Sequence, residues 1–190
     1  MANNWKERYL NMKKLYLKAK RDMIDRFGGA APDFTLFSQD FNNGELIPEE
    51  HAGGGQNVFP KLIWTGAPTE TQSFALIIED PDAPDSEHPG NKRIWTHFVA
   101  WDIPKSLKAL DADDLTKIKI GWNTDDNNEY YGPYPPIGDP PHHYYFKLYA
   151  LSKELELDIN TTREDLLDAM QGFIIAETET MGLFERKTKD

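Results

Sequence analysis

Short apolar runs separated by turn-forming residues constrain the fold of this 190-residue chain more than any other feature. From residue 34 onward, Gly, Pro, Asn and Asp cluster between the runs. This spacing is typical of strands joined by turns, and it favours an all-β sandwich with a few helices over alternating strands and helices. The predicted strands are Phe34–Phe37, Lys61–Trp64, Ser73–Glu79, Trp95–Ile103, Tyr144–Leu151 and Phe173–Glu179.

The N-terminal segment has a different pattern. Over residues 4–27, apolar side chains recur at spacings of three or four, which predicts an amphipathic helix that ends at Gly28. We therefore expect an N-terminal helix within residues 1–29 and a β-sandwich domain over residues 30–190. The sequence leaves four docking surfaces open for this helix: its own domain, a second subunit in a homodimer, the groove of a partner protein, or a membrane surface.

A second helix is predicted near the C-terminus. Thr161 and Glu164 have the spacing of a capping box, and Gly172 is a stop signal. Leu166, Leu167 and Met170 then face inward from this helix.

Charge and composition exclude several classes of protein. The net charge is −11, with +5 on residues 1–26 and −16 on the remainder, so an acidic body argues against nucleic-acid binding. No cysteine is present for a disulfide or a thiol nucleophile, and no stretch has the roughly 20 apolar residues of a membrane span. Because residues 1–5 do not resemble a secretory signal, we expect a cytoplasmic protein.

Two proline-rich segments adjoin buried strands and carry the titratable side chains. They are residues 80–84 (Asp-Pro-Asp-Ala-Pro) and residues 132–144, which contain five prolines. Proline fixes its own φ and restricts the residue before it, so these loops hold side chains in defined positions. Loops of this kind commonly carry function.

A histidine occurs within the predicted strand at residues 95–103. Strand alternation places Trp95, His97 and Val99 on one face, and Thr96 and Phe98 on the other. Such a histidine is usually structural, and it joins a site only if the sheet brings it near Asp80 and His142.

Residue types alone leave several chemistries open. A zinc site from His97, His142 and a carboxylate lacks the usual ligand spacings, and no Gly-x-Ser-x-Gly elbow indicates a serine hydrolase. Asp80 and Asp82 are a candidate carboxylate pair for glycoside cleavage, but residues two apart in a loop have no fixed separation. An anion pocket built from imidazoles, a tyrosine hydroxyl and loop amides is the fourth option, with Asp80 orienting a histidine.

The acidic segment 111–128 resembles a calcium loop only in its charge. It lacks the alternate spacing of oxygen ligands and the glycine of such a loop, so we expect a solvated loop. No metal or other cofactor is predicted for this chain.

Three ordered motifs carry a family resemblance over about residues 33–186. They are Asp-Pro-Asp-Ala-Pro at 80–84, Trp-Thr-His-Phe-Val at 95–99, and Gly-Pro-Tyr-Pro-Pro-x-Gly at 132–138 running into His142-His143-Tyr144. Together they resemble the phosphatidylethanolamine-binding protein family, in particular its bacterial branch labelled Raf-kinase-inhibitor-like.

The resemblance implies a fold, a pocket and a function. The implied fold is an antiparallel β-sandwich of one large and one small sheet, with a shallow pocket for phosphate-like anions and phospholipid head groups. Eukaryotic members modulate kinases and other partners and are not enzymes, which implies a non-enzymatic binding protein here. The implied ligand-binding residues are Asp80, Asp82, His97, His142 and Tyr144, with Pro84, Tyr134 and Pro135 in the wall.

Two departures from the family pattern bear on this pocket. Tyr134 stands where a small residue is frequent, so it narrows the pocket or adds a hydroxyl to it. His143 stands where arginine is common, which removes a permanent charge. The competing hypothesis is a small hydrolase or lyase in which His142 acts as acid or base and Asp80 orients it.

Overall fold

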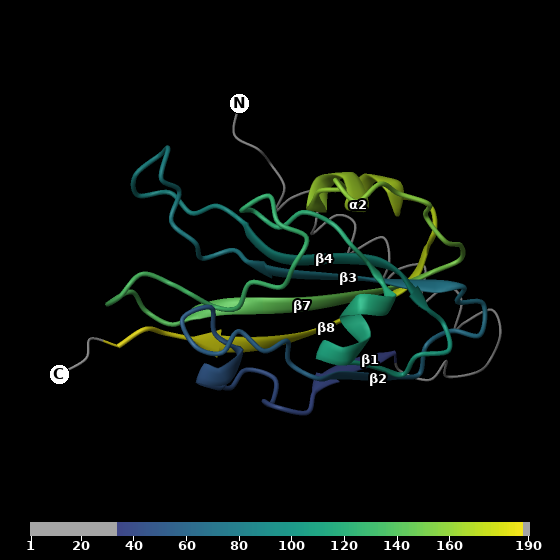
Figure 1. Ribbon diagram of the computed structural model, residues 1–190, viewed down its shortest axis with the longest axis horizontal. Coiled ribbons are helices and arrows are strands. Elements are labelled where there is room, and N and C mark those ends of the chain that lie inside the picture. Colours follow the sequence, from purple (N-terminus) through teal and green to yellow (C-terminus); the bar gives the residue numbers. More distant parts are fainter. Residues whose placement is uncertain (1–33, 188–190) are drawn as a thin grey trace, which may run out of the picture. The chain divides into compact units, whose positions relative to one another are not determined.

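The computed structural model describes residues 34–187, which fold into two antiparallel β-sheets (Figure 1). The small sheet has the order β1-β2-β5, and the large sheet has the order β6-β4-β3-β7-β8. The strands are β1 (Thr35–Ser38), β2 (Leu62–Thr65), β3 (Ser73–Asp80), β4 (Trp95–Pro104), β5 (Ala109–Leu110), β6 (Lys119–Ile120), β7 (His142–Leu151) and β8 (Ile174–Phe184). The predicted two-sheet fold is confirmed.

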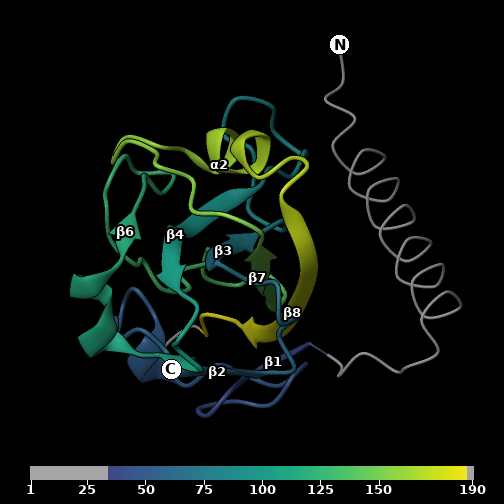
Figure 2. The same cartoon turned by 90° about the vertical axis from the view of Figure 1, so that its right-hand side faces the viewer.

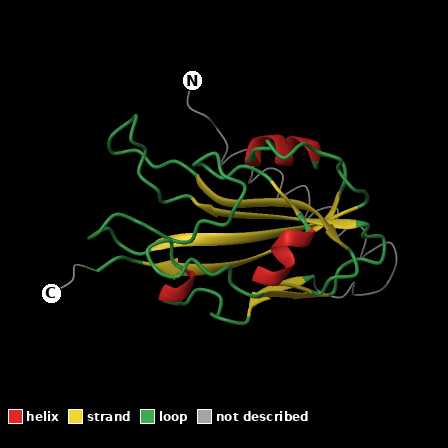
Figure 3. Ribbon diagram, viewed as in Figure 1, coloured by secondary structure: helices red, strands yellow, loops and turns green. Residues whose placement is uncertain are grey.

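Helices are few in this part of the chain (Figure 3). They are α2 (Arg163–Ala169) and the 3₁₀ helices η1 (Glu49–His51) and η2 (Ala112–Lys117). None of them is long and apolar enough to cross a membrane. The predicted N-terminal helix at residues 4–27 and the domain boundary after residue 29 lie outside the described residues.

The large sheet buries both of its faces. One face packs against the small sheet through a core that includes Phe74, Phe98 and Phe146, and the other lies beneath α2 with Ile77 and Trp101. Figures 1 and 2 show α2 and the small sheet on opposite sides of the large one. Because both faces are covered, β3 reads as a continuous apolar run rather than an alternating one.

The α2 helix is capped one residue later than the sequence predicted. Thr162, not Thr161, is the N-cap, and its capping-box partner is Asp165 rather than Glu164. The Thr161 hydroxyl instead donates to the carbonyl of Asp158 at 2.5 Å in the preceding turn. The inward side of the helix is as predicted, because Leu166 and Met170 are fully buried and Leu167 packs against them.

Two strands extend beyond their predicted ends. β7 begins at His142, and β8 continues to Phe184, with which His142 is paired. The predicted strand ended too early because Glu177–Thr180 is polar. β8 is an edge strand that is only half covered, so it lacks the apolar run by which the other strands were predicted.

The face assignment predicted within β4 is wrong at Phe98 and Val99. Ile78 pairs with Phe98 but Glu79 pairs with Thr96, so His97 is an extra residue in a β-bulge. The bulge leaves Phe98 in the core between the sheets and Val99 beneath α2. His97 therefore lies on the face of Trp95 and Phe98, whereas strict alternation grouped it with Val99.

The acidic segment 111–128 is more ordered than a solvated loop. It contains η2 and β6, and it then turns around the buried Asn123. The Asn123 side-chain oxygen accepts hydrogen bonds from the backbone of Asp125 and Asn127, at 3.0 and 3.1 Å. In residues 34–187, no group of three or more potential ligands is placed to hold a metal ion.

Candidate functional site

A pocket of about 340 Å³ lies at one end of the large sheet, where β3 ends and β4 and β7 begin. Antiparallel pairing brings these three strand ends together, although they are far apart in the sequence. The lining residues are Asp80, Ala83, Pro84, Trp95, His97, Asp125, Tyr131, Tyr134, Pro135, Pro136, His142 and Tyr144. All the residues predicted from the sequence except Asp82 are among them.

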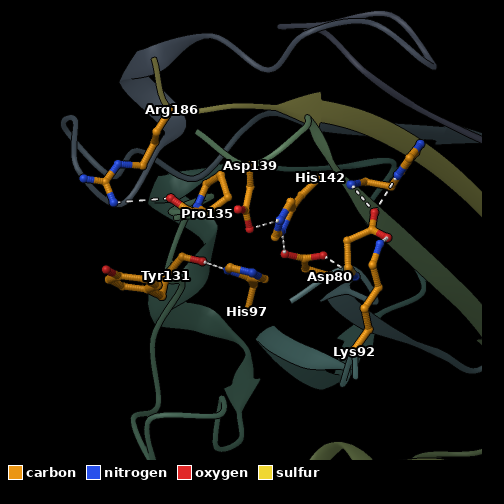
Figure 4. A network of polar contacts seen from close by, with 10 residues as sticks. Asp80, Lys92, His97, Tyr131, Pro135, Asp139, His142 and Arg186 are labelled. Carbon is orange, nitrogen blue, oxygen red and sulfur yellow. Dashed lines mark hydrogen bonds and ion pairs between the residues drawn. The ribbon is translucent and has the colours of Figure 1, made fainter. Parts of the chain in front are cut away.

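Asp80 and His142 form a buried pair at the base of the pocket (Figure 4). The side chains are 4 and 5 % exposed, and His142 Nδ1 donates to Asp80 Oδ2 at 2.7 Å. The other Asp80 oxygen accepts the backbone N–H of Asp82, which fixes the carboxylate at the strand end. His142 Nε2 then faces Asp139 Oδ2 at 3.5 Å, so both ring nitrogens lie beside carboxylates.

His97 is held in a defined tautomer on the opposite side of the pocket. Its Nδ1 donates to the carbonyl of Tyr131 at 2.5 Å, which leaves Nε2 without the proton in the neutral ring. Burial lowers the pKa of His97, so the neutral ring is favoured. The ring also packs edge-on against Tyr144.

Tyr144 lies beside both of these histidines. Its ring packs against both imidazoles, and the residue is 1 % exposed. Its hydroxyl makes no hydrogen bond of good geometry within the described part of the chain. Burial, and secondarily the nearby Asp80 carboxylate, raise the pKa of Tyr144, so the hydroxyl keeps its proton.

Asp82 lies outside the lining of this pocket and pairs with two other side chains. One of its oxygens accepts from Lys92 Nζ at 2.5 Å, and the other accepts from the backbone and Nδ1 of His143. Partial burial alone would raise its pKa, but these hydrogen bonds outweigh that effect and lower the pKa to about 2. Asp82 therefore joins the loop after β3 to the start of β7.

A glycine-rich turn supports the aromatic wall of the pocket. A Cβ atom on Gly53 would lie 2.9 Å from the Tyr131 ring, and one on Gly54 would lie 2.6 Å from the Tyr134 ring. The two tyrosines pack edge to face, and Arg186 covers the Tyr134 ring with its guanidinium carbon 3.7 Å from the centroid. Arg186 also donates to the Pro135 carbonyl.

Sequence reasoning missed three polar or aromatic lining residues. Trp95 belongs to the motif at 95–99 and Tyr131 precedes the motif at 132–138, so the motifs were a signal for both. Asp125 comes from the acidic segment that was read as solvated, and only the turn around Asn123 brings it to the pocket. Nothing in the local pattern distinguishes it from Asp126.

The charge of the lining determines what the pocket can hold. Its ionisable groups are two carboxylates, two imidazoles and three phenols, and within residues 34–187 it contains no lysine or arginine. The carboxylates accept hydrogen bonds only, whereas a protonated imidazole and a phenol donate. The pocket thus offers donors to an anion and acceptors to a cation in one small volume.

The fold and the site together define a class of protein: an antiparallel β-sandwich domain with a polar pocket at one end of its larger sheet. The family model for phosphatidylethanolamine-binding protein matches residues 37–185. The chain is a member of that family, as its three motifs indicated.

Relatives from archaea and bacteria are similar over most of the chain. A UPF0098 protein of Methanothermobacter thermautotrophicus is 38% identical over 80% of this chain and 99% of its own length. A UPF0098 protein of Aquifex aeolicus is also 38% identical, over 84% and 91% of the two chains.

Two solved structures share the fold and part of the sequence. A putative phosphatidylethanolamine-binding protein homologue from Chlamydia trachomatis has a TM-score of 0.75 and 35% identity, covering 85% of this chain and 100% of its own. The Escherichia coli protein YbcL, described as a member of the mammalian family, has a TM-score of 0.72 and 30% identity, covering 80% and 98%. The family fold is that of a binding protein.

Proposed function

We propose that this protein binds small phosphate-bearing ligands or phospholipid head groups in the pocket and does not catalyse a reaction on them. One observation carries the proposal: the buried hydroxyl of Tyr144, whose ring packs against two fixed imidazoles, has no hydrogen bond of good geometry in the described structure. A buried polar group without a partner costs about 1–3 kcal/mol. A ligand oxygen that accepts its hydrogen bond removes that cost.

Anion binding in this pocket requires protons. The neutral His97 ring presents a lone pair at Nε2, and His142 Nε2 faces Asp139. Protonation converts both Nε2 atoms into donors, so a phosphate group is bound together with protons. Because burial lowers the pKa of His97, affinity is expected to rise as pH falls below ~6.5.

The carboxylates and aromatic rings suit the opposite charge on the same ligand. Asp80 and Asp125 accept hydrogen bonds from an ammonium group, and the ring of Tyr131 in the same lining attracts a cation. A zwitterionic head group such as phosphoethanolamine supplies both charges. The family name supports this choice, since it names phosphatidylethanolamine as the ligand of the family.

The alternative function is that of a small hydrolase or lyase. It is favoured by the Asp80–His142 hydrogen bond, which has the geometry of an oriented acid or base. Against it, the described lining holds no serine, threonine or cysteine nucleophile. Turnover of a phosphate ester that disappears in folded His142→Ala protein would decide for the enzyme.

The test is a titration of the full chain with phosphoethanolamine and inorganic phosphate, followed by the NMR resonances of the histidine rings. Saturable shifts at His97 and His142 are expected, and His142→Ala abolishes them. His88→Ala is the matched control, because His88 is an exposed histidine outside the pocket and should leave binding unchanged. Absence of any shift at millimolar ligand would contradict the proposal.

A further inference from the structure

A second polar pocket, of about 300 Å³, shares no lining residue with the pocket at the end of the large sheet. It is formed by η1, the start of η2 and the segments that follow β1 and precede β2. Its charged lining consists of four carboxylates and one lysine: Asp40, Glu50, Asp111, Asp113 and Lys61. The lining therefore carries an excess of negative charge.

His51 adds a buried imidazole to this acidic lining. The residue is 3 % exposed, and its Nδ1 lies 2.8 Å from the carbonyl oxygen of Val58. A carbonyl oxygen only accepts, so Nδ1 carries the proton and the neutral ring has a lone pair at Nε2. Within the described part of the chain, this Nε2 has no hydrogen-bond partner.

Two carboxylate oxygens lie beside His51 Nε2. Glu50 Oε1 is 3.6 Å and Asp40 Oδ2 is 3.7 Å from it, which is longer than a hydrogen bond. Asp40 Oδ2 also accepts the backbone N–H of Lys61 at 2.7 Å and has a second lone pair free for another donor. The three atoms are acceptors that converge, so the group that fits among them donates several hydrogen bonds.

An ammonium group fits this arrangement of acceptors. It has three donors and a positive charge, whereas a water molecule has two donors and leaves the negative charge uncompensated. A metal ion is a weaker match, because no group of three or more potential ligands in residues 34–187 is placed to hold one. Val58 lines the same pocket and is 38 % exposed, so it offers apolar surface to an alkyl stem.

We propose that this pocket binds an aliphatic diamine or polyamine, with one ammonium group donating to His51 Nε2, Asp40 and Glu50. A single ammonium group would leave part of the negative charge of the lining uncompensated, which favours a ligand with a second one. Asp113 is the remaining carboxylate for that group, since Lys61 Nζ already lies 3.9 Å from Asp111. This site is independent of the proposed function, because the two pockets have no residue in common.

The test is a titration of the full chain with putrescine, followed by the NMR resonances of the histidine rings. Salt at about 0.15 M screens attraction between exposed charges that are more than roughly 8 Å apart. Saturable shifts are expected at His51, while His97 and His142 in the other pocket stay unchanged.

Two analogues of putrescine separate hydrogen bonding from charge. 1,4-Bis(trimethylammonio)butane keeps both charges and the four-carbon stem but has no N–H donor, so it should bind at least about tenfold more weakly. Butylamine keeps one ammonium group, and its affinity should be about two- to fivefold lower, as for the loss of an exposed ion pair.

A matched pair of variants locates the site on the chain. Glu50→Gln should weaken putrescine binding about two- to fivefold, because the Glu50 side chain is 55 % exposed. Glu49→Gln removes the same charge from the neighbouring residue of η1, which lies outside this pocket, and should leave the affinity unchanged. Both residues are exposed, so neither substitution removes a core contact.

Several results would overturn the amine site. Equal affinity for putrescine and 1,4-bis(trimethylammonio)butane would mean that only the charge of an acidic protein is sensed. Shifts confined to His97 and His142 would place the amine in the other pocket. A shift of His51 with Zn²⁺ but not with putrescine would indicate a metal site instead, and no shift at millimolar putrescine would leave no amine site at all.

Discussion

Glu79 and Asp80 are consecutive buried carboxylates of β3, and they have opposite roles. Glu79 faces α2, where Lys147 and Arg163 both contact it. Asp80 faces the pocket, where it accepts a hydrogen bond from His142. Burial alone would raise the pKa of Glu79, but the two cations outweigh that effect and hold the pKa below its usual range.

The difference lies in the partners rather than in burial. Lysine and arginine keep their charge at any physiological pH, so the Glu79 network is permanently compensated. Asp80 instead pairs with an imidazole in the lining of the pocket, so its network is open to a ligand. One strand thus carries a structural ion-pair network on one face and a responsive one on the other.

The largest expected effect is on the structural side. Glu79→Gln removes the buried carboxylate that Lys147 and Arg163 share, and breaking a buried pair in this way costs about 3–5 kcal/mol. Denaturant unfolding should show this loss, while the affinity of the folded protein for phosphoethanolamine stays unchanged. Glu164→Gln is the control, because Glu164 pairs with the same arginine at the surface and is worth about 0–1 kcal/mol. Equal losses would contradict the comparison.

On the pocket side, Asp80→Asn should act mainly on binding. Asparagine keeps the oxygen that accepts the Asp82 N–H but removes the carboxylate oxygen that accepts from His142 Nδ1. A hydrogen bond to a charged group is worth about 1.5–3 kcal/mol, so phosphoethanolamine affinity at pH 6 should fall about 10- to 100-fold. Calorimetric titration measures it. Unchanged affinity would mean that Asp80, like Glu79, has a structural role and no role in binding.

Tyr144→Phe separates binding from stability within the pocket. Loss of the hydroxyl should weaken binding about tenfold, while the free energy of unfolding stays equal or rises by about 1 kcal/mol because a buried unpaired group is removed. Tyr130→Phe provides the control, since the Tyr130 hydroxyl donates to the His51 carbonyl at 3.0 Å. That variant should lose about 1 kcal/mol of stability and no affinity. The opposite pattern would contradict the proposed role of Tyr144.

The smallest effect concerns pH. The pKa of His97 is lowered in the folded protein, so the unfolded chain binds this proton first as pH falls. The His97 contribution to stability is therefore present above ~6.5, falls below that pH, and levels off below the folded pKa. Urea unfolding of the natural protein and of His97→Gln between pH 5 and 8 measures the difference. Parallel curves would show that His97 titrates equally in both states.

The sequence predicted the sheets because apolar runs and turn residues are local signals. It predicted the pocket through motifs, which also carried Pro84, Tyr134 and Pro135 into the right loops. It could not predict that Asp82 turns toward Lys92 and His143, since residues two apart in a loop share no fixed direction. It could not predict Asp125 either, because the turn around Asn123 brings this residue to the pocket.

Strand register and helix capping are a second group of features that the sequence did not predict correctly. Either of two adjacent threonines fits a capping box, and the turn at Asp158 decides between them. The bulge in β4 has no local signature, because it exists only in the pairing of β4 with β3. Tertiary pairing therefore moved both Thr161 and Val99 away from their predicted places.

The same bulge gives His97 an unusual status in the chain. Phe98 and Thr96 satisfy the pairing with Ile78 and Glu79, so His97 is one residue more than the ladder uses at this point. A deletion of His97 would remove this bulge, and we expect it to keep the circular dichroism of the fold while losing phosphate binding. A single codon gained or lost then adds this imidazole to the pocket or takes it away.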